Sequence, residues 1–192
     1  SGVYAGIRPE RIEKFVNIDA YGAKPGAGPE ALKHYRRWLR RINRGAPEHQ
    51  YASWAEFEKR LQHMHPRMPA DRVRYLAHHW AQEREGRIVL THDPAHARND
   101  GMDLTNRLDE AMAAWRAVEA PTLILLARQG GAVFRAPDLT PGATGPERFG
   151  CFRNRREIWF EDSGHMVHIE RPGEVAGIVE RFMQGGLAAL PA

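Results

Sequence analysis

The chain has 192 residues and a mass of 21.8 kDa, with 42% hydrophobic residues, 27% charged residues and a formal net charge of +4. This composition is typical of folded proteins and excludes a disordered or collagen-like chain. No apolar stretch approaches the roughly 20 residues that span a bilayer, and no secretory signal pattern is present, so we expect a cytoplasmic protein. The single cysteine, Cys151, excludes an internal disulfide and a zinc site built on several thiolates.

The first predicted element is a strand over residues 13–19, a short apolar run between turn residues. From about residue 23 to residue 118 the pattern changes to that of helices. Ser53 and Glu56 match a capping box, and Asp71 is a candidate helix cap. Apolar residues recur at helical spacing in four segments: 32–42, 53–63, 71–80 and 108–115.

Two further strands follow the helices. Residues 121–127 are apolar without alternation, which is typical of a parallel strand covered on both faces. Residues 157–161 form a third strand, and Pro172 can begin a helix that continues to residue 182. The sequence therefore predicts an α/β chain with about three parallel strands. Sheets usually hold about 4–6 strands, so we expect part of this sheet to precede residue 1.

The sharpest local signal is the segment 162–172, DSGHMVHIERP. It places His165 on a Gly-containing loop just after a strand, where open α/β sheets gather their catalytic groups. This segment resembles the α/β-hydrolase superfamily, whose last strand leads into a Gly-His loop and a helix beginning near Glu-x-Pro. Residues 4–19 are similar to the helix after the family's nucleophile elbow and the next strand. Residues 121–127 are similar to its penultimate strand, and the helical middle to its cap.

The resemblance implies a division of the chain and a chemistry. Residues 1–22 and 119–184 are expected to be the C-terminal portion of the hydrolase core and residues 23–118 an all-helical cap. Residues 185–192, rich in Gly, Ala and Pro, are expected to be a flexible tail. The family hydrolyses ester-like or related small substrates by a nucleophile, a histidine and an acid, without a metal or organic cofactor. The substrate would be a small molecule.

The resemblance also implies roles for single residues. His165 would be the general base, and Asp19 at the end of the first strand its acid, although a turn-forming aspartate is also common there. Asp138, the first carboxylate after the penultimate strand, is the alternative acid. Three residues are candidates for the wall of the substrate pocket: Tyr21, Trp80 and Met166.

No nucleophile is predicted in this chain. The only serines are Ser1, Ser53 and Ser163, and none lies in a Gly-x-Ser-x-Gly turn. We therefore expect the chain alone to be inactive. The alternative function is a non-catalytic α/β-hydrolase-like binding module or truncated product.

Other classes of partner are less well supported by the residues. Among the ten histidines, the pair His92 and His96 has metal-ligand spacing, but Pro94 disfavours the helix that would bring them together. The basic residues over 33–44 surround an apolar stripe as on a solvated amphipathic helix, so neither nucleic-acid nor membrane binding is predicted. An incomplete sheet would expose an edge near Val16, through which copies could self-associate.

Overall fold

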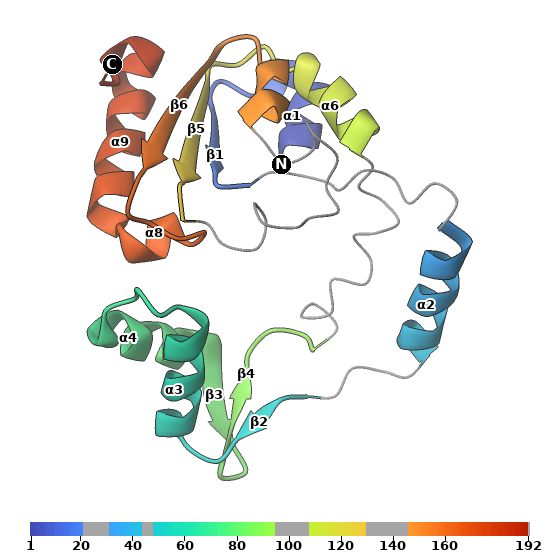
Figure 1. The fold of residues 1–192 in the computed structure, drawn as a ribbon, viewed down its shortest axis with the longest axis vertical. Coiled ribbons are helices and arrows are strands. Elements are labelled where there is room, and N and C mark those ends of the chain that lie inside the picture. The colour runs from blue at the N-terminus through green and yellow to red at the C-terminus, as the bar shows by residue number, and fades with distance from the viewer. Residues whose placement is uncertain (21–30, 44–47, 95–107, 130–145, 192) are drawn as a thin grey trace. The chain divides into compact units, whose positions relative to one another are not determined.

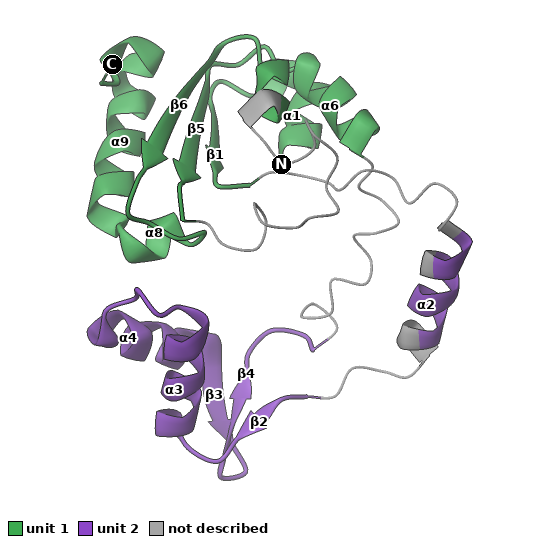
Figure 2. Cartoon of the chain, viewed as in Figure 1, with its two compact units in different colours: residues 1–26, 106–192 green, residues 27–105 purple. Residues whose placement is uncertain are grey.

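The computed structural model describes residues 1–20, 31–43, 48–94, 108–129 and 146–191 (Figure 1). The chain divides into two compact units (Figure 2). The first comprises residues 1–26 and 106–192, and the second comprises residues 27–105. Among the described helices, none has the length and apolar character needed to cross a membrane.

The first unit contains a three-stranded parallel sheet. Its strands are β1 (Phe15–Ile18), β5 (Thr122–Ala127) and β6 (Arg155–Phe160), in the order β1-β5-β6. All six residues of β5 are buried, as expected for a central strand covered on both faces. The three predicted strands and their parallel pairing are therefore confirmed.

The two faces of the sheet carry separate apolar cores. Successive residues of a strand point to opposite faces, so Ile124 and Leu126 of β5 join one core and Leu123 and Leu125 the other. The first core includes residues of α1 (Gly2–Ile7), α6 (Leu108–Arg116) and η4 (Pro146–Cys151). The second includes residues of α8 (Val167–Glu170) and α9 (Pro172–Gly185). A short η1 (Pro9–Arg11) precedes β1.

Two features of the first unit differ from the sequence expectations. Helix α6 lies in the interval expected to be cap, but its buried residues Leu108, Ala111 and Trp115 pack in the first core. The tail expected to be flexible forms η5 (Gly186–Ala189) with Leu190 buried. The two differences have the same cause. Apolar residues of α6 and of the tail are buried against apolar residues that lie far away in the sequence.

The close approach of α1 to α6 makes a test of this packing. A Cβ atom built on Gly6 would lie 1.9 Å from the carbonyl oxygen of Ala114, a backbone atom that cannot move alone. We expect Gly6→Ala to lower the free energy of unfolding by about 2–3 kcal/mol in urea titrations, because the helices must separate. Gly177→Ala on α9 is the control, since its nearest neighbour is the Arg181 side chain at 3.7 Å. It should leave stability unchanged or raise it by up to about 1 kcal/mol. Equal stability of Gly6→Ala and the parent chain would contradict this packing.

The second unit combines helices with a small antiparallel sheet. Its helices are α2 (Ala31–Asn43), α3 (Trp54–Met64) and α4 (Ala70–Trp80). Its strands are β2 (Gln50–Tyr51), β3 (Ala81–Arg84) and β4 (Arg87–Leu90), in the order β2-β4-β3. The expectation of an all-helical cap was therefore wrong for this interval. Glu85 and Gly86 both have positive φ, 53° and 71°, which is the conformation of a tight hairpin turn between β3 and β4.

The predicted helix starts had different outcomes. The Ser53 hydroxyl accepts a hydrogen bond from the Glu56 N–H at 3.2 Å, which confirms the predicted cap of α3. Asp71 was predicted to cap α4, but the helix begins one residue earlier and its N-cap is Pro69. Asp71 instead lies in the first turn, where a negative charge is favourable beside the free N–H groups.

Candidate active site

The candidate site is built at the carboxyl ends of the parallel strands. Asp19 directly follows β1, and His165 lies on the loop between β6 and α8. The carboxyl ends of parallel strands share one edge of the sheet, so these loops meet there. Nδ1 of His165 lies 2.8 Å from Oδ2 of Asp19, although the residues are 146 positions apart in the sequence. The structure thus brings together the two side chains that the resemblance singled out.

Asp19 is fixed on several sides. Its side chain is 0% exposed, and its Oδ1 accepts a hydrogen bond from the Ala127 N–H at 2.9 Å. Its own N–H donates to the Leu125 carbonyl at 2.7 Å. The φ angle of Asp19 is 47°, in the left-handed region that aspartate tolerates better than most residues. These contacts hold the Asp19 side chain so that its second carboxylate oxygen, Oδ2, faces His165.

Asn17 closes the turn that holds this conformation. Its Oδ1 accepts a hydrogen bond from the Ala20 N–H at 3.0 Å, and its Nδ2 donates to the Ala20 carbonyl at 2.9 Å. These two hydrogen bonds tie the Asn17 side chain to the residue that follows Asp19 and so hold the turn. The sequence analysis did not single out Asn17. Its only sequence signal is an asparagine two residues before a strand-end aspartate.

The Asp19 carboxylate determines the state of the His165 ring. A carboxylate can only accept, so Nδ1 of His165 carries the proton and donates it, which leaves Nε2 as the nitrogen that can take another proton. The hydrogen bond to Asp19, assisted by its negative charge, raises the pKa of His165 above 6.5, and partial burial opposes this. The side chain remains 49% exposed. Charge on this ring is therefore stabilised while the ring stays accessible.

His168, three residues further on, has the opposite electrostatic environment. Partial burial, together with the positive charge of His165, lowers the pKa of His168 below 6.5. Both causes that shift the pKa of His168 disfavour a proton there, whereas the hydrogen bond to Asp19 favours a proton on His165. The opposite pKa shifts favour His165 over His168 as the candidate base.

The loop that carries His165 is held from both sides. The Ser163 carbonyl accepts a hydrogen bond from the Gln129 N–H at 3.0 Å, which joins this loop to the end of β5. One carboxylate oxygen of Glu170, Oε2, lies 2.8 Å from the Gly164 N and 3.2 Å from the Ser163 Oγ. The sequence analysis assigned no role to Glu170.

The described serines and the cysteine do not present a nucleophile next to His165. Ser163 is completely buried, and its hydroxyl contacts Glu170. Ser53 caps α3 in the second unit, and Ser1 precedes α1. Cys151 is buried in the core that contains β5 and α6.

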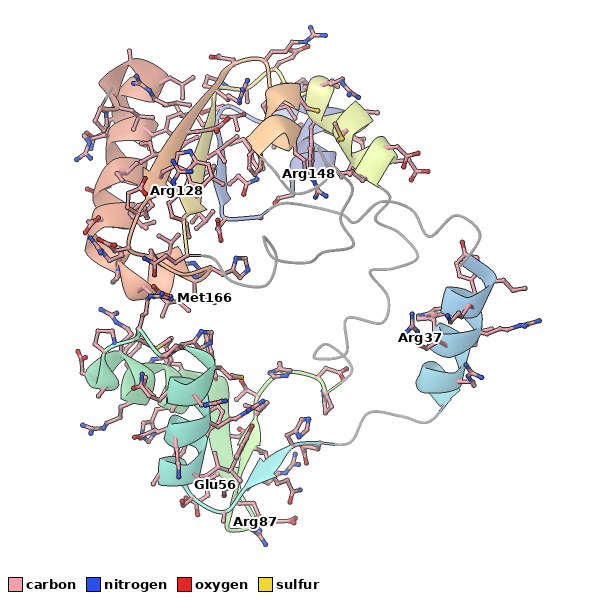
Figure 3. All side chains as sticks on the ribbon, in the orientation of Figure 1. Arg37, Glu56, Arg87, Arg128, Arg148 and Met166 are labelled. Carbon is pink, nitrogen blue, oxygen red and sulfur yellow. The ribbon has the colours of Figure 1, made fainter. Side chains whose placement is uncertain are left out.

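The remaining candidate residues are spread over the chain. Met166 follows His165 and precedes α8, where it is partly buried (Figure 3). Trp80 is the last residue of α4, in the second unit. Tyr21 and Asp138 lie outside the described residues.

The described part of the chain holds no group of metal ligands, and its described cavity lies away from Asp19 and His165. In the parts of the chain that the structure describes, no three His, Cys, Asp or Glu side chains gather as metal ligands would. A cavity of about 390 Å³ is lined by Pro9, Arg116, Glu119 and Arg153, among others. These residues precede the three strands, whereas Asp19 and His165 follow them, so this cavity is at the opposite end of the sheet.

Several solved structures are similar to this chain. A thioesterase domain from the curacin biosynthetic pathway has a TM-score of 0.74 and 14% identity, over 93% of this chain and 61% of that one. An esterase of M. tuberculosis has a TM-score of 0.65 and 17% identity, over 96% and 60%. An α/β hydrolase from Novosphingobium aromaticivorans has a TM-score of 0.58 and 17% identity, over 93% and 59%. No protein-family model and no curated protein matches the sequence. This chain spans about three-fifths of the length of the three similar structures named above.

Proposed function

We propose that this chain, which has the α/β-hydrolase fold, supplies the base and the acid of a hydrolase acting on small ester-like substrates. His165 is the base and Asp19 is the acid. The observation that carries the proposal is the 2.8 Å hydrogen bond between His165 Nδ1 and the fully buried Asp19 carboxylate. Both groups lie at the carboxyl ends of parallel strands, where open α/β sheets bind their ligands.

The geometry supports a defined proton path. Nε2 of His165 takes the proton of an attacking hydroxyl as its oxygen forms a bond to the ester carbonyl carbon. The Asp19 carboxylate holds Nδ1–H throughout and stabilises the imidazolium that forms. The imidazolium then gives the proton to the leaving alkoxide, and His165 activates a water to release the acyl group. The Asp19 hydrogen bond that raises the pKa of His165 favours the protonated ring in this step.

The attacking group is proposed to come from outside residues 1–192. The sequence contains no Gly-x-Ser-x-Gly turn, and the buried Ser163 cannot serve. The similar structures include proteins named as a thioesterase and an esterase, which supports an ester or thioester as the substrate class. We assign the second unit as the cap, and Trp80, Met166 and Tyr21 stay candidates for pocket residues on the sequence alone. The proposed chemistry uses no metal or organic cofactor.

A second candidate function is a non-catalytic binding module with the same fold. In this case the base and the acid would be retained without turnover. Strand β1 is at one end of the order of the described strands, so self-association through the edge of this sheet stays a prediction for either function.

Residues 1–192 alone are expected to hydrolyse p-nitrophenyl acetate no faster than free imidazole at the same concentration, because a base without a nucleophile offers only background catalysis. Release of p-nitrophenolate measures the rate, and the His165→Ala chain serves as the control. A chain extended by a Gly-x-Ser-x-Gly segment of the same protein should gain turnover under the hydrolase proposal and none under the binding proposal. Strong activity of residues 1–192 that is lost in His165→Ala would overturn our placement of the nucleophile.

A further inference from the structure

A second carboxylate, that of Glu170, contacts the backbone of the loop that carries His165. Glu170 is the last residue of α8, and its Oε2 lies 2.8 Å from the Gly164 N and 3.2 Å from the Ser163 Oγ. Gly164 is bonded directly to His165 in the chain. The contact therefore fixes the peptide from which the histidine side chain projects.

The helix that carries Glu170 is itself well anchored. The Val167 side chain is fully buried in the core beneath β5, and Ile169 is 7% exposed. The N–H groups of Ile169 and Glu170 both donate to the Met166 carbonyl, at 2.8 and 3.0 Å. Glu170 thus connects a rigid helix to the loop six residues before it.

The chemistry of this contact is stronger than that of an ordinary loop hydrogen bond. Backbone N–H groups bound to a carboxylate form charge-assisted hydrogen bonds, which are shorter and stronger than neutral ones. The Ser163 side chain is buried, so its hydroxyl cannot easily exchange Glu170 for water. Asp19 acts on the ring of His165, whereas Glu170 acts on the backbone before it.

We propose that Glu170 is a positioning residue that holds the Gly164 peptide so that the His165 ring meets Asp19. This inference rests on the proposed function for its catalytic meaning, although the contact can be tested without turnover. Glu170 fixes the position of the Gly164 peptide, and this peptide fixes the position of the His165 ring. The hydrogen bond to Asp19 then determines that Nδ1 carries the proton.

The test uses NMR of isotope-labelled residues 1–192 with three variants. In Glu170→Ala the Gly164 amide should exchange with solvent about tenfold faster, because its acceptor is lost. The His165 ring should also titrate at a lower pH than in the parent chain, because it leaves Asp19. Glu170→Gln keeps an acceptor oxygen without the charge and should largely restore both measurements.

Glu174→Ala is the matched control. Glu174 lies in the first turn of α9, and its carboxylate pairs with Arg171. Removing this nearby negative charge should leave Gly164 exchange and the His165 titration at their parent values. Thermal unfolding by circular dichroism verifies that each variant is folded.

Two results would overturn the proposal: unchanged Gly164 exchange and His165 titration in a folded Glu170→Ala chain, or a Glu170→Gln chain that behaves like Glu170→Ala. The second would show that the negative charge of Glu170 acts on the His165 ring directly, and not through a hydrogen bond to the Gly164 peptide. Failure of the proposed function would look different. The protein that joins residues 1–192 to their nucleophile segment would then show no turnover that depends on His165, while Gly164 exchange in residues 1–192 would still report whether Glu170 holds the loop.

Discussion

Replacing His165 by alanine is expected to abolish hydrolysis of p-nitrophenyl butyrate by a protein that joins residues 1–192 to their nucleophile segment. Without an imidazole, no group takes the proton of the attacking hydroxyl, and the Asp19 carboxylate is left buried without its partner. The expected loss in kcat/KM is about 10⁴-fold or more. Stopped-flow or plate-reader release of p-nitrophenolate measures it.

His168→Gln is the control for this substitution. It removes a neighbouring histidine on α8 whose pKa is lowered by burial and by the charge of His165. This variant should retain most of the activity. Equal activity of His165→Ala and the parent protein would rule out His165 as the base, and an equal loss in His168→Gln would rule out the distinction between them.

The raised pKa of His165 also fixes the direction of the pH dependence. A general base must be neutral, so kcat/KM should increase as the pH rises through a value above 6.5. Folding is linked to the same group with the opposite sign. The stability that protonated His165 gains from Asp19 is fully present below pH 6.5 and is lost as the pH rises through the folded-state pKa. Activity and this part of stability therefore change in opposite directions.

The sequence predicted those parts of the fold that depend on short-range patterns. The apolar run that becomes β5 has few alternatives, because a continuous apolar segment must be buried on both faces. The shorter apolar runs in β1 and β6 are bounded by turn residues, which is typical of strands. The pairing of Asp19 with His165 could be anticipated for a similar reason. Two loops that follow parallel strands of one sheet lie at the same edge, whatever the distance between them in the sequence.

Features that depend on contacts between distant residues could not be predicted in the same way. The apolar stripe of α6 fits either unit, and only its packing against Gly6 and the sheet assigns it to the first. The β3–β4 hairpin depends on the positive φ angles of Glu85 and Gly86, and a Glu-Gly pair is a weak turn signal. The tail is held by the Arg156 side chain, which donates to the Leu190 carbonyl at 2.8 Å, a partner that composition does not reveal.

Substitutions of Asp19 are expected to separate its structural and chemical roles. Asp19→Ala leaves the buried Ala127 N–H without its acceptor and places at φ 47° an alanine, which tolerates the left-handed region less well than aspartate. The expected loss in the free energy of unfolding is about 2–4 kcal/mol, from the unmade hydrogen bond and the left-handed backbone. Asp19→Gly also lacks the acceptor, but glycine tolerates this φ angle. It should therefore be about 1 kcal/mol more stable than Asp19→Ala. Urea titrations of residues 1–192 measure both.

Asp19→Asn keeps an oxygen for the Ala127 N–H, so it should be more stable than Asp19→Ala. Its amide N–H₂ would face His165, however, and would force the ring to present a lone pair at Nδ1 and its proton at Nε2. The base would then be in the wrong tautomer, and kcat/KM should fall by about 10⁴-fold in the protein that includes the nucleophile. Nitrogen chemical shifts of the His165 ring report the tautomer directly. If Asp19→Asn kept both full activity and the parent tautomer, Asp19 would be a structural aspartate and the acid would have to be sought elsewhere in the chain.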